Sequence, residues 1–221
     1  MDTGRIDVIV LLDRSGSMET GRADHEGGLR SIVRDQRRLA GDVRLTFIRF
    51  DSHDPFEMVL DGVPLEDVRE EDLTLIPRGG TPLLDAVGRT VVHMEARFKE
   101  ASPQPEQVVL LIITDGGENS SREYTKEKVR ELITAKEQGG TWRSLYLGAN
   151  VDAFAEAKGL GIAGAVALDY HANPQGIAAM YCSASSNLAS ARNARAGGVS
   201  GVEAYSALNF MDEQRSWATG Q

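Results

Sequence analysis

Side chains that offer oxygen ligands occur in three separated segments of the sequence. Two segments, which begin at residues 13 and 115, directly follow apolar runs, and the third follows two glycines and precedes a helical pattern. Mg²⁺ prefers octahedral coordination by hard oxygen ligands at about 2.0–2.1 Å, and carboxylates and hydroxyls supply such ligands. The simplest joint interpretation is a magnesium site formed by five residues. They are Asp13, Ser15, Ser17, Thr81 and Asp115.

Each segment also has a purely structural interpretation. The segment 13–17 could form only an Asx turn and a helix cap. Thr81 stands before a proline and is a candidate N-cap, and Asp115 with the glycine after it is a common turn dipeptide. The occurrence of all three segments together, each next to a predicted strand or helix, favours the metal site over three unrelated turns.

The elements that must position these residues are two buried strands. The apolar runs at 6–12 and 108–113 predict strands buried on both faces, as in a parallel sheet. Ligands of open α/β sheets bind beyond the carboxyl ends of such strands. Further strand patterns at 43–50, 142–147 and 166–168 alternate with helical patterns. This alternation predicts an α/β fold with a doubly wound, mostly parallel sheet and helices on both faces.

Two local patterns refine this prediction. A short alternation of apolar residues at 56–60 predicts one antiparallel strand, and Pro55 favours its position at an edge of the sheet. The segment 20–28 is polar and glycine-rich, and helical spacing of apolar residues begins only at Leu29. We therefore expect the first helix to follow that segment.

The end of the chain carries a further helix and an apolar extension. A helical stripe at 174–196 predicts a last helix packed on the sheet. We divide the chain into a domain at 1–196 and a C-terminal extension at 197–221, which is too apolar for a freely solvated tail. We expect the extension to dock on the domain or on a partner. Its large apolar residues are Tyr205, Leu208, Phe210 and Trp217.

Composition limits the class of protein. The chain has 221 residues, 41% of them hydrophobic and 26% charged, as in ordinary soluble globular proteins. Its formal net charge of −9 argues against nucleic acid or an anionic membrane as the main partner. No apolar run approaches the roughly 20 residues of a membrane helix, and the first residues show no secretory signal. The single cysteine excludes an internal disulfide, so we expect a cytoplasmic protein.

A competing function would use the same carboxylates for catalysis. Asp13 would be the nucleophile of a Mg²⁺-dependent phosphotransferase or hydrolase, with Asp115 as a magnesium ligand. Such enzymes commonly carry a second acid two residues after the nucleophile, where this sequence has Ser15. The sequence contains neither a Walker motif nor a nucleophile elbow. The four histidines lack the spacing of a zinc site and are expected at the surface or in caps, so we predict that the protein is not an enzyme.

The five oxygen-bearing residues match the metal-ion-dependent adhesion site of von Willebrand factor A domains. The chain resembles that family over about residues 5–170, and it looks most similar to the small, stand-alone bacterial or phage members. The resemblance implies the strand order 3-2-1-4-5-6. It also implies direct coordination of the metal by the three hydroxyls, whereas the two carboxylates act mainly through water.

In that family the metal captures an acidic residue of another protein. The resemblance therefore implies a metal-dependent protein-binding module, an adaptor or regulator, in which Mg²⁺ accepts an Asp or Glu of the partner. Mn²⁺ and Ca²⁺ are alternative ions, and the extension is a candidate surface for self-association. We expect Arg14, Met18, Glu118 and Asn119 to line the rim of the site. Asp85, in the first turn of its helix, could interact with the helix dipole or orient the loops of the site.

Overall fold

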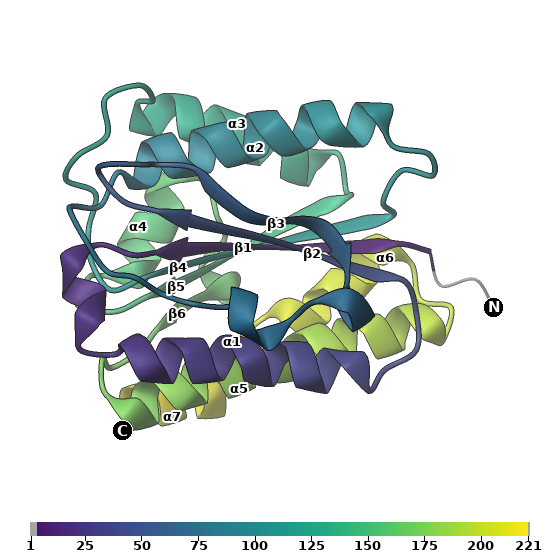
Figure 1. Cartoon of the computed structure of the whole chain (residues 1–221). Helices are drawn as coiled ribbons and strands as arrows, with labels where there is room; N and C mark the ends of the chain where they lie inside the picture. Colours follow the sequence, from purple (N-terminus) through teal and green to yellow (C-terminus); the bar gives the residue numbers. More distant parts are fainter. Residues whose placement is uncertain (1–3, 221) are drawn as a thin grey trace.

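The apolar runs form the central strands of one sheet (Figure 1). The computed structural model describes residues 4–220, and this part of the chain contains six strands. The strands are β1 (Ile6–Asp13), β2 (Val43–Phe50), β3 (Glu57–Pro64), β4 (Gln107–Thr114), β5 (Trp142–Gly148) and β6 (Ala167–Asp169).

The strands lie in the order β3-β2-β1-β4-β5-β6, and only the β2–β3 pair is antiparallel. The predicted strand order and antiparallel edge strand are confirmed. Every residue of β1 and β4 is buried, which explains their apolar composition, because helices cover both faces of a parallel sheet. Leu12 of β1 is in register with Ile113 of β4, so Asp13 and Thr114 end these strands side by side.

Helices cover both faces of the sheet, as the alternation predicted. Within residues 4–220 they are α1 (Arg22–Arg37), α2 (Leu83–Glu100), α3 (Lys126–Gln138), α4 (Ala153–Gly159), α5 (Pro174–Ala196), α6 (Gly201–Ala204) and α7 (Asp212–Thr219). Short 3₁₀ turns are η1 (Gly16–Glu19), η2 (Leu65–Asp67), η3 (Glu70–Asp72), η4 (Gly164–Val166) and η5 (Tyr205–Leu208).

The connections after β1 and β4 leave the sheet in opposite directions. Figure 1 shows α2 and α3 on one face, and α1, α5 and α7 on the other. The chain passes from β1 to α1 and from β4 to α3, so it reaches opposite faces from two adjacent strands. Such a switch point opens a crevice at the carboxyl ends of the strands. The residues that follow β1 and β4 line this crevice.

The first helix begins earlier than we predicted, at Arg22 instead of after the glycine-rich segment. The reason is the close packing of α1 against α5. A Cβ atom at Gly28 would lie 2.1 Å from the Tyr181 side chain, so glycine is required where the two helices meet. Glycine lowers helix propensity by roughly 1 kcal/mol, and this tertiary contact overrides that preference.

The C-terminal residues pack on the same chain. Tyr205, Leu208 and Phe210 are buried in the core, whereas Trp217 is 56% exposed. The Phe210 N–H donates to the Ala165 carbonyl at 2.8 Å, so this segment is also held by its backbone. The division of the chain at residue 196 stays a prediction.

The predicted last helix is confirmed as α5, which packs between α1 and α7. Ile177, Tyr181 and Leu188 lie on its buried side. Among the described residues, no helix is both long enough and apolar enough to cross a membrane.

Candidate metal centre

Asp13, the last residue of β1, is buried and held by two hydrogen bonds. The Ser15 backbone N–H donates to Asp13 Oδ1 at 2.7 Å, which forms the tight turn that the spacing suggested. The Thr114 hydroxyl donates to Asp13 Oδ2 at 2.7 Å. Because Thr114 ends the neighbouring strand, this bond joins the two strand ends. Asp13 is 0% exposed and therefore has a fixed orientation.

A chain of hydrogen bonds joins the hydroxyls after β1 to the carboxylate after β4. Ser15 Oγ and Ser17 Oγ lie 3.0 Å apart. The Ser17 hydroxyl donates to Asp115 Oδ1 at 2.6 Å. Since the hydroxyl hydrogen of Ser17 points to the carboxylate, its oxygen keeps lone pairs for another partner.

Thr81 reaches the same place from the loop before α2. The Gly16 N–H donates to the Gly79 carbonyl at 3.0 Å, which ties this loop to the turn after β1. A Cβ atom at Gly116 would lie 3.7 Å from Thr81 Oγ1 and 3.9 Å from Ser17 Oγ, so the two hydroxyls converge beside that glycine. The Thr81 side chain is 2% exposed, and its hydroxyl has no hydrogen-bond partner within residues 4–220. All five predicted residues are thus brought together.

The two carboxylates of this group have no cationic partner. Within the described part of the chain, no Lys, Arg or His side chain forms an ion pair with Asp13 or Asp115. Burial raises the pKa of Asp13 to about 6 despite its hydrogen bonds to Thr114 and Ser15, and the charge of Asp115 raises it slightly further. Burial also raises the pKa of Asp115. Two partly desolvated carboxylates therefore meet with no side-chain cation to balance them.

The donor set fits a hard divalent cation. Three hydroxyls and two carboxylates offer only oxygen, the ligand type that Mg²⁺, Mn²⁺ and Ca²⁺ prefer. Among residues 4–220, no cluster of three or more His, Cys, Asp or Glu side chains has metal-binding geometry. The hydroxyls would therefore have to supply most of the direct ligands.

Two residues that we expected on the rim are buried instead. Met18 is 1% exposed and belongs to the core. Arg14 is 2% exposed because its guanidinium turns away from the site, toward Asp51 and Glu57. Its Nη1 donates to Glu57 Oε2 at 2.7 Å. Arg14 therefore neutralises carboxylates beside β2 and β3, and it cannot contact a partner at the metal site.

The other two expected rim residues, together with Asp85, hold the loop after β4. Asn119 Oδ1 accepts the Thr81 N–H at 2.9 Å, and Glu118 Oε2 accepts the Leu84 N–H at 2.9 Å. Asp85 accepts the backbone N–H groups of residues 122–124, each at 2.8 Å. Of the two alternatives for Asp85, the structure shows that it orients the loop.

Thr114 is a residue of the site that we did not predict. Its hydroxyl bonds Asp13, and its backbone carbonyl accepts the Tyr170 hydroxyl at 3.1 Å. The available signal was a hydroxyl at the end of an apolar run, directly before Asp115. A contact between this hydroxyl and Asp13 can be inferred only when β1 and β4 are known to be neighbours.

A hollow of about 270 Å³ lies directly beside the metal centre. Ser17 and Asp115 belong to its wall, together with His25, Asn150 and Ile177. The lining combines apolar surface with hydrogen-bonding groups. If a partner's carboxylate binds at the metal centre, a neighbouring side chain of that partner fits into this hollow.

His25 corrects our expectation that the histidines lie at the surface or in caps. It is 1% exposed, and its Nδ1 lies 3.1 Å from the Tyr181 hydroxyl. Tyr170 and Tyr181 contact its ring edge-to-face. Burial lowers the pKa of His25 to about 4, so the ring is neutral at physiological pH.

Comparisons with known proteins identify the fold. No protein-family model and no curated protein sequence matches the chain. Solved structures similar to it include proximal thread matrix protein 1 from the mussel byssus, a von Willebrand factor type A protein from Catenulispora acidiphila, and the PilB minor pilin from Streptococcus sanguinis. The fold is therefore that of von Willebrand factor A domains.

The similarity lies in the structure far more than in the sequence. The mussel protein has a TM-score of 0.60 and 15% identity, and the match covers 80% of this chain and 46% of that chain. The Catenulispora protein has a TM-score of 0.56 and 16% identity, and the match covers 80% of this chain and 41% of that chain. PilB has a TM-score of 0.59 and 12% identity, and the match covers 84% of this chain and 61% of that chain. Our chain thus spans less than half the length of the first two. A further structure of the mussel protein, with a TM-score of 0.61, 13% identity, and coverage of 81% and 46%, has zinc in its MIDAS motif.

Proposed function

We infer that the chain is a metal-dependent protein-binding module whose divalent cation, Mg²⁺, receives an acidic side chain of a partner. One observation carries this proposal. Asp13 and Asp115 are buried without a cationic partner beside three hydroxyls. Charges taken out of water need a partner, and a divalent cation would balance these two. The zinc-occupied motif of a structural neighbour supports the same kind of site.

Each residue has a distinct part in this proposal. Ser15, Ser17 and Thr81 would hold the ion directly through their hydroxyl oxygens. Asp13 and Asp115 would orient those ligands and balance the charge, as outer carboxylates do at other metal sites. When bound, the ion supplies an electrophilic position that accepts a carboxylate oxygen. Because hydroxyl ligands are neutral, they leave the ion more positive than a carboxylate cage would.

The alternative, a phosphotransferase or hydrolase with Asp13 as nucleophile, is disfavoured by the same geometry. Asp13 is 0% exposed, and both of its carboxylate oxygens accept hydrogen bonds. A nucleophile needs a free lone pair that faces the substrate. We therefore propose a binding function without catalysis. A cytoplasmic location, the absence of nucleic-acid and membrane partners, and self-association through residues 197–221 stay predictions.

A peptide array tests the proposed function. Each peptide carries one Asp or Glu and is paired with a peptide that has Asn or Gln at the same position. We expect the chain to retain acidic peptides in Mg²⁺ buffer and to lose them in chelator. Thr81→Val should lose retention, because it removes one direct ligand. Thr134→Val, the same substitution on α3 and outside the hollow beside the metal centre, should behave as wild type.

Two results would count against this function. One is equal retention in chelator and in Mg²⁺. The other is equal retention of acidic and amide peptides, which would show that no carboxylate is captured.

A further inference from the structure

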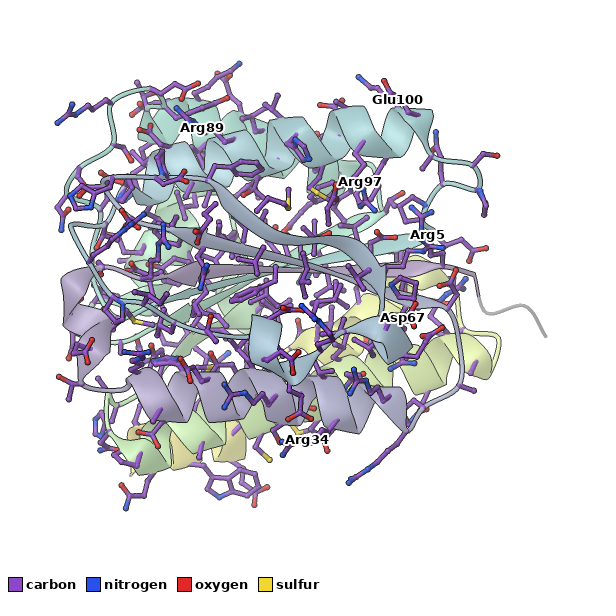
Figure 2. The ribbon with its side chains drawn as sticks, in the orientation of Figure 1. Arg5, Arg34, Asp67, Arg89, Arg97 and Glu100 are labelled. Atoms are coloured by element: carbon purple, nitrogen blue, oxygen red, sulfur yellow. The ribbon has the colours of Figure 1, made fainter. Side chains whose placement is uncertain are left out.

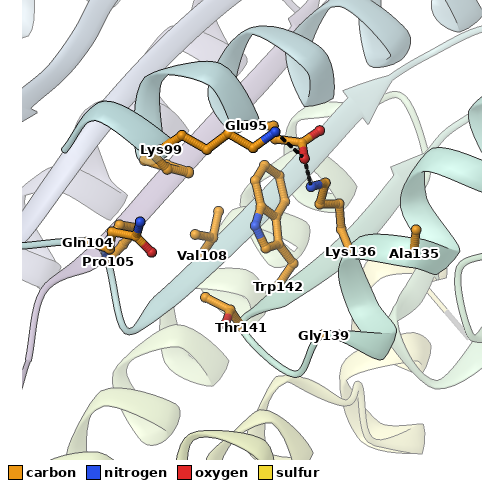
Figure 3. A pocket seen from close by; sticks show the side chains of 11 residues that line it. Glu95, Lys99, Gln104, Pro105, Val108, Ala135, Lys136, Gly139, Thr141 and Trp142 are labelled. Atoms are coloured by element: carbon orange, nitrogen blue, oxygen red, sulfur yellow. Dashed lines mark ion pairs between the residues drawn. The ribbon is translucent and has the colours of Figure 1, made fainter.

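A second cavity lies at the opposite end of the sheet from the metal centre (Figure 3). Its volume is about 260 Å³, and α2, α3, β4, β5 and the loop before β4 contribute to its walls. Trp142, the first residue of β5, and Val108, near the start of β4, line it. Nothing in the metal-dependent function uses this cavity.

The indole of Trp142 presents an unused hydrogen-bond donor in this cavity. The side chain is 7% exposed, and Phe98 fixes its ring edge-to-face, with the ring centres 5.9 Å apart. The indole N–H donates to none of the residues 4–220 and is not among their fully buried unpaired groups, so it is open to the cavity. Figure 3 shows the indole nitrogen on the side of the ring that faces Val108. A ligand in the cavity that supplies an acceptor can therefore bind this N–H.

The rim of the cavity carries one positive charge in excess. Lys99 Nζ and Lys136 Nζ lie 3.2 Å and 2.8 Å from the same oxygen, Glu95 Oε1, as the dashed lines in Figure 3 mark. Hydrogen bonds from Lys136 and Lys99 lower the pKa of Glu95, so this carboxylate is ionised at neutral pH. The other lining residues among those described are uncharged. An ammonium group has three donors, so both lysines can bind a further anion.

The size and lining of the cavity restrict its ligand to a small molecule with an aromatic ring or a branched chain. Pockets for drug-sized ligands have roughly 300–1,000 Å³, so about 260 Å³ accepts a molecule of one ring. Pro105, Val108 and the Trp142 ring provide apolar walls. We propose that this cavity binds a small aromatic monocarboxylate, with its ring against these walls and its carboxylate at Lys136, Lys99 and the indole N–H.

Fluorescence of Trp142 tests this proposal with benzoate as the probe. The only other tryptophan is Trp217, so the Trp217→Phe background leaves Trp142 as the sole indole. We expect benzoate to change the Trp142 emission saturably, with or without Mg²⁺. Benzamide, which lacks the charge, should bind about tenfold more weakly, and benzylamine should not bind.

Lysine variants locate the charge that holds the carboxylate. Lys136→Met keeps the aliphatic stem and should weaken benzoate about tenfold while leaving benzamide unchanged. Lys128→Met is the matched control, because Lys128 lies on the same helix, pairs with Glu131 at 3.2 Å and is outside the cavity. Thermal unfolding of both variants verifies the fold.

Saturation-transfer NMR on benzoate provides a second readout that does not depend on the fluorophore. Absence of binding in both measurements would overturn the proposal. Equal affinity for benzoate, benzamide and benzylamine would overturn it too, as would an unchanged benzoate affinity in Lys136→Met.

Discussion

The central strand β1 carries a buried aspartate at each end, and the two differ in their surroundings. Asp7, near the amino end, lies 2.6 Å from Arg5 Nε and 3.4 Å from Arg97 Nη1. Figure 2 shows Arg5 and Arg97 toward that end of the sheet. Asp13, at the carboxyl end, is equally buried but has no cationic side chain beside it among residues 4–220.

This difference separates a structural carboxylate from a functional one. Burial raises the pKa of both residues, but for Asp7 the two arginines counteract the effect of burial. At the amino end of β1 the chain supplies its own cations, so the charge of Asp7 is balanced without a bound ion. At the carboxyl end it supplies hydroxyls instead, which can hold a cation but cannot replace its charge.

Breaking the ion pair between Arg5 and Asp7, at the amino end of β1, should have the largest effect on stability. Arg5→Met leaves Asp7 with only the longer contact to Arg97, so we expect a loss of about 3 kcal/mol in the free energy of unfolding. Urea unfolding of the metal-free protein measures this loss of stability. Adding Asp7→Asn should recover most of the loss, because the unpaired charge is then gone. As control, Arg69→Met breaks an exposed pair with Asp72 and should lower stability far less than Arg5→Met does.

If Arg5→Met were as stable as wild type, Asp7 would need no cation. The contrast between the two ends of β1 would then disappear.

At the carboxyl end, removing the charge should have the opposite effect. Asp13→Asn should stabilise the metal-free protein at pH 7 by about 3 kcal/mol at most, from a folded-state pKa near 6 against an ordinary value of 3.8. The amide that replaces the carboxylate can donate to Thr114 Oγ1, because the Thr114 hydroxyl hydrogen can turn to the Gly116 carbonyl at 2.9 Å. Urea unfolding in chelator measures the difference.

The dependence of this effect on pH follows from the raised pKa. Protonation of Asp13 favours the folded chain, so the cost of its charge is present in full above pH 6 and is lost as the pH falls toward 3.8. The advantage of Asp13→Asn should shrink over the same range. A variant that is less stable than wild type at pH 7 would show that the charged carboxylate stabilises the metal-free fold.

Thr81 should give the smallest effect on stability and still a clear effect on metal binding. Its hydroxyl bonds none of the residues 4–220, so Thr81→Val should change the free energy of unfolding by about 0.5 kcal/mol or less in chelator. The affinity for Mn²⁺ should fall by about tenfold, because a direct ligand is lost. Urea unfolding and a Mn²⁺ titration measure the two quantities. A large loss of stability with unchanged affinity would make Thr81 a structural residue.

The sequence predicted most of the fold from its apolar runs. β1 and β4 are buried along their whole length, and continuous apolar composition is the direct sign of such strands. The strand order came from the resemblance to a family, because pairing between distant strands leaves no trace in one sequence. The start of α1 was wrong for a similar reason. Gly28 is explained only by Tyr181, a residue of another helix.

The candidate site shows the same limit. Asp13, Ser15, Ser17, Thr81 and Asp115 could be named from residue type and spacing, and the structure brings them together. The contacts that position them could not be derived. Thr114 acts across two strands, so its role follows from a tertiary contact alone. Asp85 could be named, but its role stayed open between two alternatives until α2 was placed beside the loop after β4. The burial of Arg14 likewise depends on acids beside β2 and β3.

Calorimetric titration of chelator-treated protein with Mg²⁺ and Mn²⁺ is the most direct test of the metal centre. We expect saturable binding of about one ion per chain to the wild type and to the Thr134→Val control. Binding should be lost in Asp115→Ala, which removes one of the two uncompensated carboxylates. Absence of binding to the wild type, or binding of equal affinity to Asp115→Ala, would contradict the assignment of this edge as a metal centre.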